Sequence, residues 1–219
     1  MSTARERRGN GEPLAEQAYA ALRDRIVTLR IPPGAPINED ALGRELGLGR
    51  TPLREGIKRL ALENLVTVYP RRGTFASPVD RGDLAAISDV RCQLEGHAAF
   101  RAAQRLTADQ EAELRSLAAE LAASGAGADA QTLMELDARV HRFVHRAAAN
   151  PYLEATLARY FNLSLRIWYL ALERLPHLAA RVHEHSDLLA AIAERDAEGA
   201  RAIMEEHIAT FEDEIRAVL

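Results

Sequence analysis

The chain has 219 residues, 47% of them hydrophobic, which is enough for one or two globular domains with buried cores. Its single cysteine excludes an internal disulfide framework, and no apolar run reaches the roughly 18 residues of a membrane helix, so we expect a cytoplasmic protein without a membrane partner. Residues 1–78 contain 13 Lys and Arg against 9 Asp and Glu, whereas residues 79–219 contain 15 against 23, so the two parts favour different partners.

The first 78 residues predict a flexible tail, three helices and a β-hairpin. Apolar side chains recur at three- and four-residue steps, prolines end the first such segment, and Asn38 is a favourable N-cap for the second. The tail covers residues 1–12, the helices about 14–29, 39–47 and 50–63, and the strands 65–69 and 74–76. Short helices before a hairpin are typical of a winged helix-turn-helix, whose recognition helix enters the DNA major groove.

After Pro78, long segments rich in Ala, Leu, Arg and Glu replace the strand signals and predict an antiparallel helical bundle. Its helices are expected at about 82–105, 108–124, 130–149, 151–174, 177–195 and 197–218. The predicted chain is therefore mainly α-helical, with a winged helix-turn-helix DNA-binding domain at 13–78 and an all-helical domain at 79–219.

A cationic stripe lies on the third predicted helix, because Arg50, Arg54 and Lys58 are four residues apart and share one face. Arg50 and Arg54 occupy its leading end, where an arginine can donate two hydrogen bonds to guanine. Thr51 suits a phosphate or a base edge, whereas Lys58 and Arg44 suit the phosphate backbone.

The hairpin turn adds two further basic residues, Arg71 and Arg72, beside Gly73. A glycine lets backbone approach a groove closely, so this turn predicts a weakly selective DNA contact. A solvated basic face is the alternative interpretation. Basic residues on both helix and hairpin favour binding to double-stranded DNA.

About 60 residues, from "LRDRIVTLRIPPGAPINEDALGRELGLGRTPLREGIKRL" to "RRGTFASPV", follow the frame of a known domain. The segment resembles the DNA-binding domain of the GntR family of bacterial transcriptional regulators. The resemblance implies that Arg50, Thr51 and Arg54 read the operator and that Gly73 is the wing glycine at the minor groove. Gly49 and Asn64 depart from the family's usual Ser or Thr and Gly, and we expect slightly weaker binding.

Histidines occur only beyond residue 96, and several have the spacing of metal ligands. Asp137 and His141 are four apart and project from one helix face. His185 and His207 are each 11 residues from Asp196 and meet if their helices pack antiparallel. Three imidazoles and a carboxylate suit a divalent transition metal (Zn, Ni, Mn or Fe). The alternative is that each histidine is an ordinary surface or core residue.

The sequences "DVRCQLEGHAA", "DARVHRFVHRAAAN" and "EHSDLLAAIAERDAEGARAIMEEH" resemble the helical ligand-binding domain, called FCD, of the FadR-like branch of the same family. The resemblance implies metal ligands at Asp137, His141, His185 and His207, and leaves His145 and His183 as bystanders or outer groups. Arg91 and Arg166 are candidates for binding an acidic effector, since arginine pairs bidentately with carboxylate. Their alternative role is a structural salt bridge, for Arg91 with Glu95.

We therefore predict a non-enzymatic, homodimeric transcription regulator, most consistent with a repressor, that binds a roughly palindromic operator. Its effector-binding and dimerisation domain, residues 79–219, would bind a metal ion and a small organic acid that alters operator binding. Two alternatives stay open: a regulator whose effector pocket holds no metal, and a mononuclear metal hydrolase, for which Glu184 beside the predicted ligands is the only support.

Overall fold

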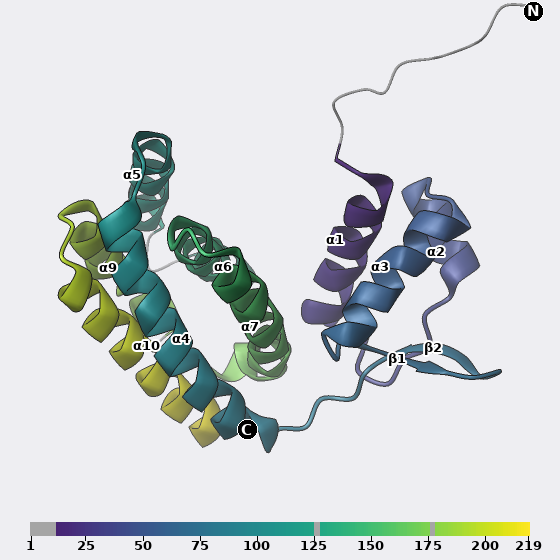
Figure 1. The fold of residues 1–219 in the computed structure, drawn as a ribbon. Coiled ribbons are helices and arrows are strands. Elements are labelled where there is room, and N and C mark those ends of the chain that lie inside the picture. The colour runs from purple at the N-terminus through teal and green to yellow at the C-terminus, as the bar shows by residue number, and fades with distance from the viewer. Residues whose placement is uncertain (1–11, 125–127, 176–177) are drawn as a thin grey trace, which may run out of the picture. The chain divides into compact units, whose positions relative to one another are not determined.

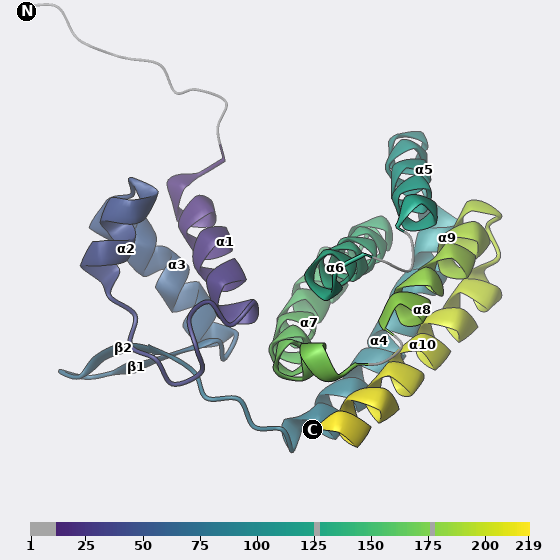
Figure 2. The same cartoon turned by 180° about the vertical axis from the view of Figure 1, so that it is seen from behind.

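The computed structural model describes residues 12–124, 128–175 and 178–219, and the chain divides into two compact units that meet at Val79 and Asp80 (Figures 1 and 2). Each unit is described by itself. The flexible tail predicted for residues 1–12 lies outside the described residues except for its last position. Within the described residues, no helix is long and apolar enough to cross a membrane.

The N-terminal unit consists of three helices and a two-stranded antiparallel hairpin, as the sequence predicts (Figure 1). Its elements are α1 (Leu14–Val27), α2 (Glu39–Leu46), α3 (Arg50–Leu62), β1 (Val66–Tyr69) and β2 (Gly73–Ala76). The hairpin pairs Val66 with Ala76 and Tyr69 with Gly73. The apolar stripes of α1 and α3 face each other, and Leu22, Ile26 and Leu60 are fully buried. The predicted winged helix-turn-helix is confirmed.

Two local features of this unit differ from the simple periodic pattern. The first helix ends at Val27 rather than Leu29, which has a positive φ of 58°, and Leu14 at the other end of the stripe is 56% exposed. Asn64 also has a positive φ, of 64°, just after α3. Asparagine tolerates this left-handed conformation better than most residues, so its replacement of the family's glycine keeps the turn.

The C-terminal unit is entirely helical in its described residues, which confirms the predicted bundle. Its elements are α4 (Asp83–Arg105), α5 (Ala108–Ala123), α6 (Ala130–Ala147), α7 (Pro151–Ala171), the 3-10 turn η1 (Leu172–Arg174), α8 (Leu178–His183), α9 (His185–Ala193) and α10 (Ala197–Val218). Side-chain caps define several starts: Thr107 forms a capping box with Gln110, and Asn150 accepts from two backbone amides ahead of Pro151 at the first helical position.

One helix predicted for this unit is wrong. In place of the single helix predicted for 177–195, the described residues form two helices, α8 and α9, separated at Glu184 (Figure 2). No proline or glycine marks the break. Instead, the Glu184 side chain pairs with Arg181 and with His207 of α10, and such tertiary contacts leave no periodic signal in the sequence. Similarly, α7 ends at Ala171 and continues to residue 174 only as η1.

The core of the bundle is unusually polar where the helices meet. α4 and α10 lie side by side in both views, and α4 also contacts α6, α7 and α9 (Figures 1 and 2). Among apolar residues such as Phe143, Phe161 and Trp168, the interior contains several charged or titratable side chains. These are Arg91, Glu95, Asp137, His141, His145, Arg166, His185 and His207. Burying such groups is costly unless they pair or bind a ligand, so they mark a candidate site.

Candidate DNA-binding surface and metal-binding cluster

The residues predicted to contact DNA are all exposed in the N-terminal unit. They are Arg44, Arg50, Thr51, Arg54, Lys58, Arg71, Arg72 and Gly73. The three basic residues of the stripe lie on the solvent face of α3, opposite the buried Leu53, Ile57 and Leu60. α3 begins at Arg50, and its N-cap residue Gly49 offers no side-chain cap, so the first amides of the helix are free to face a phosphate.

Two carboxylates of the first turn of α2 contact the arginines of α3, and these pairs were not predicted from the sequence. Asp40 Oδ1 lies 3.3 Å from Arg50 Nε, and Glu39 Oε2 accepts a 3.4 Å hydrogen bond from Arg54 Nε. The other oxygen of Glu39 accepts from the hydroxyl of Thr74 on β2 at 2.8 Å. Glu39 therefore connects the recognition helix to the wing. These pairs place one carboxylate beside each of the two exposed arginine side chains.

The wing has the backbone that its sequence requires. Gly73 has a φ of 101°, a conformation that L side chains rarely adopt, and Arg71 has a φ of 61°. The guanidinium of Arg72 lies 5.5 Å from the ring centre of Tyr69, which keeps it beside β1. The hairpin thus presents two basic side chains next to Gly73, whose backbone is not covered by a side chain of its own.

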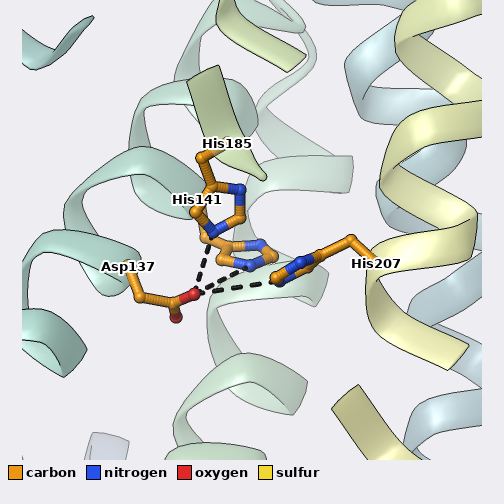
Figure 3. Close-up of side chains that lie close together, drawn as sticks. All are labelled: Asp137, His141, His185 and His207. Carbon is orange, nitrogen blue, oxygen red and sulfur yellow. Dashed lines mark hydrogen bonds and ion pairs between the residues drawn. The ribbon is translucent and has the colours of Figure 1, made fainter. Parts of the chain in front are cut away.

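In the C-terminal unit, the four predicted metal ligands come together although they lie on three helices (Figure 3). Asp137 and His141 are on α6, His185 is the first residue of α9, and His207 is on α10. Asp137 Oδ1 lies 2.9 Å from Nε2 of His185 and 3.8 Å from Nε2 of both His141 and His207. All four side chains are buried.

The chemistry of this cluster fits a divalent transition metal. One ligand atom from each residue lies within 4.8 Å of all the others. Two metal–nitrogen bonds of about 2.1 Å span about 4.2 Å, so small side-chain movements would bring all four into reach of one ion. Buried atoms without a hydrogen-bond partner among the described residues include Asp137 Oδ2 and Nε2 of His141 and His207. Buried polar atoms without partners fit a cluster that can bind an ion.

Electrostatics favour the protonation states that metal binding needs. Burial lowers the pKa of His141, and it lowers the pKa of His207 to about 4, so both imidazoles are neutral at neutral pH. Burial opposes the ionisation of Asp137, but its contacts with His141 and His185 outweigh this and lower its pKa to about 2. A metal ion would therefore meet a carboxylate and neutral imidazoles.

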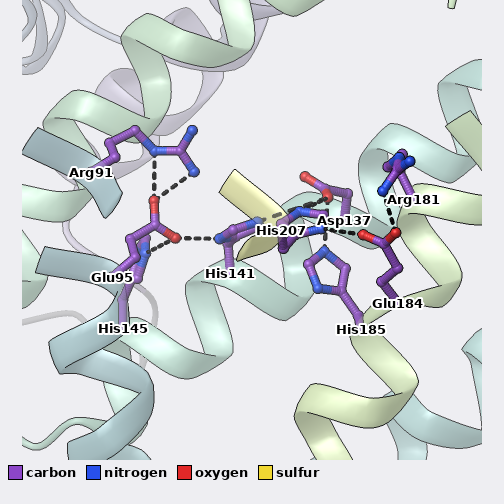
Figure 4. Close-up of polar contacts among 9 residues, drawn as sticks. All are labelled: Arg91, Glu95, Asp137, His141, His145, Arg181, Glu184, His185 and His207. Atoms are coloured by element: carbon purple, nitrogen blue, oxygen red, sulfur yellow. Dashed lines mark hydrogen bonds and ion pairs between the residues drawn. The ribbon is translucent and has the colours of Figure 1, made fainter. Parts of the chain in front are cut away.

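Two further carboxylates bond the Nδ1 atoms of two histidines in the cluster (Figure 4). Glu95 on α4 bonds Nδ1 of His141, and Glu184 bonds Nδ1 of His207 at 3.1 Å. Each carboxylate also pairs with an arginine, Glu95 with Arg91 and Glu184 with Arg181. Carboxylate–histidine pairs of this kind orient the histidines of metal sites.

The two arginines expected to bind effector are buried. Arg91 donates from Nε to Glu95 Oε1 at 2.6 Å, which is the structural salt bridge of its alternative role. Its guanidinium also lies 4.8 Å from the ring centre of Trp168. Arg166, 2% exposed, has a pKa lowered to about 10 by burial and stays cationic at neutral pH.

The two remaining histidines of this region lie outside the cluster. His145 is buried with Nε2 3.3 Å from Glu95 Oε2, and the His183 ring contacts the carbonyl oxygen of Ser124 at 2.7 Å. The sequence pattern indicated Glu95 only as a partner of Arg91. No local signal connects Glu95 to His141, because they are separated by 46 positions in the sequence.

Comparison with known proteins agrees with this two-part architecture. The model of the gntR family of bacterial regulatory proteins matches residues 14–76, and the FCD domain model matches residues 86–210, more than half of the chain. The chain belongs to the GntR family. Among its relatives, the HTH-type transcriptional repressor RspR of Escherichia coli (strain K12) is 23% identical over 207 residues, covering 94% of this chain and 91% of RspR.

A second relative of this GntR regulator, the HTH-type transcriptional repressor GlaR of the same strain, is 28% identical over 201 residues, covering 88% of this chain and 91% of GlaR. The solved structure of E. coli McbR/YncC shares the fold, with a TM-score of 0.78 and 22% identity over 94% of this chain and 99% of that one. The matched family models and the names of the relatives are those of transcription regulators, so the chain is a DNA-binding transcriptional regulator with an FCD domain and not an enzyme.

Proposed function

We propose that this GntR regulator is a homodimeric repressor whose helical unit binds a divalent metal ion and a small organic acid that releases it from its operator. The observation that carries the proposal is the buried cluster of Asp137, His141, His185 and His207, with orphaned nitrogens facing a carboxylate. The repressor assignment is supported by the names of the relatives RspR and GlaR.

The ion would supply a fixed positive charge and open coordination positions for the carboxylate of an effector. With three imidazoles and one carboxylate as ligands, zinc, nickel, manganese and iron all remain candidates. Arg91 and Arg166 are the candidate arginines for the carboxylate of the effector, and Arg91 also pairs with Glu95. Effector binding would favour one arrangement of the helices, and coupling to the DNA-binding units would follow from that change.

Operator binding in this proposal uses one recognition helix from each protomer. Arg50 and Arg54 would read bases, while Lys58, Arg44 and the wing residues contact the backbone. Twofold symmetry of the dimer would then require a roughly palindromic site, with half-sites about one helical turn or a multiple of it apart.

The test begins with selection of bound sites from a random double-stranded DNA library, which yields an operator sequence directly. Binding to the selected site is then measured by fluorescence anisotropy with zinc-loaded and chelated protein, against a panel of small carboxylic acids. We expect a palindromic consensus and acids that release DNA only from the zinc-loaded protein. Release that ignores the chelator would replace this proposal by the metal-free regulator.

A further inference from the structure

Glu95 links α4 to the four-residue cluster, although α4 contributes none of its four members. Its side chain is fully buried and contacts three partners, Arg91, His141 and His145 (Figure 4). One oxygen, Oε1, accepts from Arg91 on the preceding helical turn, and the other, Oε2, bonds Nδ1 of His141. The three side chains form a continuous chain of charge and hydrogen bonds from α4 to α6.

This chain selects one tautomer of His141. Two nitrogens of the buried Arg91 guanidinium, Nε and Nη2, contact Glu95 Oε1, and this ion pair holds the carboxyl in its ionised form. An ionised carboxylate only accepts hydrogen bonds, so the neutral His141 ring must donate from Nδ1. Its lone pair is then on Nε2, the atom that faces Asp137. That is the form of histidine that coordinates a metal ion.

Glu95 is better suited to this role than to holding an ion of its own. Glu95, His141 and His145 also lie close enough together to be considered as a second metal-binding group. However, the buried guanidinium of Arg91 contacts the same carboxylate, and its fixed positive charge repels a second cation.

Glu184, the other outer carboxylate, is a weaker anchor. Its side chain is 36% exposed, and it lines a surface pocket of about 210 Å³ that also includes His207. Water can therefore replace its contact with the outer nitrogen of His207. No such replacement is available to the buried contact between Glu95 and His141.

We propose that Glu95 is a positioning residue that holds His141 as the Nδ1–H tautomer, with Nε2 toward the ion. Through the same hydrogen bond, metal binding at His141 stabilises α4. The second part rests on the proposed metal function. α4 begins at Asp83, shortly after the N-terminal unit ends at Val79. Stabilisation of the start of α4 would therefore restrict the motion of the segment that joins the two units.

The test uses the full chain with three variants. Glu95→Gln keeps a neutral acceptor, whereas the double variant Arg91→Met/Glu95→Leu removes both charges and avoids leaving a stranded guanidinium in the core. Glu205→Gln is the matched control, because Glu205 lies on α10 beside Gly96 of α4 and is not among the cluster residues. Thermal melts establish that each variant folds; if the double variant does not, Glu95→Gln alone carries the comparison.

The first readout needs no metal. Nitrogen-15 shifts of labelled histidine report the His141 tautomer in chelated protein, and we expect Nδ1–H in the wild type and control but a loss of this preference in the double variant. A wild-type His141 protonated on Nε2 would overturn the proposal. This result is independent of whether the protein binds metal, so it separates failure of this inference from failure of the proposed function.

The second readout is the zinc dissociation constant, together with hydrogen exchange of α4 amides at saturating zinc. We expect affinity about 10- to 100-fold weaker in the double variant, a smaller loss in Glu95→Gln and a change below about twofold in the control. Zinc should slow α4 exchange in wild type and control but not in the double variant. Equal affinity and equal protection in all proteins would refute the positioning role, whereas a wild type that binds no zinc would refute the proposed metal function and the α4 response together.

Discussion

Replacing Asp137 by asparagine should remove most of the stabilisation that zinc gives to the helical unit. Asp137 is the only carboxylate among the four clustered ligands, and its Oδ1 faces all three imidazole Nε2 atoms. Asparagine keeps the shape of the side chain but removes its negative charge. The comparison therefore isolates the charge that a cation requires.

The size of the effect follows from the length of the unit. Free zinc at 100 times its dissociation constant stabilises the folded state by about 2.7 kcal/mol. Residues 80–219 unfold with an entropy of about 2.1 cal/mol/K per residue, or about 0.29 kcal/mol/K, which gives a rise in Tm of about 9 °C. Loss of a ligand should weaken binding at least as much as loss of an outer partner, about 100-fold, which leaves a shift of about 1–2 °C.

The assay is differential scanning calorimetry of chelated and zinc-loaded protein at equal free zinc. Asp187→Asn is the control, because Asp187 is an exposed carboxylate on the same helix as His185 and lies outside the cluster. It should keep the full shift of the wild type. If Asp137→Asn also keeps the full shift, the zinc site is elsewhere and the assignment of these four ligands is wrong.

Four predictions concern the DNA-binding unit. Arg54→Ala should relax base preference at one operator position and cost about 1–3 kcal/mol of operator-binding free energy. Operator binding by this variant equal to wild type would contradict the recognition-helix assignment. Arg71→Ala should weaken binding to all DNA sequences and reduce the salt dependence of the binding constant by about one unit of slope. Glu39→Gln removes the negative charge that pairs with Arg54 and accepts a hydrogen bond from Thr74. Non-specific DNA binding should therefore tighten, and the ratio of specific to non-specific affinity, measured from the dissociation constants for operator and random DNA, should fall. An unchanged ratio would show that Glu39 does not influence specificity. Gly49→Ser should stabilise this unit by roughly a few tenths of a kcal/mol in denaturant unfolding, because Gly49 is an N-cap without a side-chain hydrogen bond whose extended backbone (φ −71°, ψ 165°) serine adopts readily. No gain would mean that the hydroxyl does not reach the first-turn amides.

Much of the architecture depends on interactions close in sequence, and these were predictable. The caps at Asn38 and Asn150 act within three residues, and the hairpin turn needs only its own few residues. The pair Asp137 and His141 shares a helix face by spacing alone. Pairing His185 with His207 required an assumption about how two helices pack, together with family resemblance.

The sequence by itself determined most of the elements and their order, the cationic face of α3 and the shared helix face of Asp137 and His141. Only the tertiary structure decided which side chains support them. Glu95 meets His141 across 46 positions, Glu39 meets Thr74 across 35, and the break at Glu184 accompanies its contact with His207 on another helix. The physical reason is that helix and strand periodicity encode which face a residue occupies, whereas the neighbour across that face is set by the packing of whole elements.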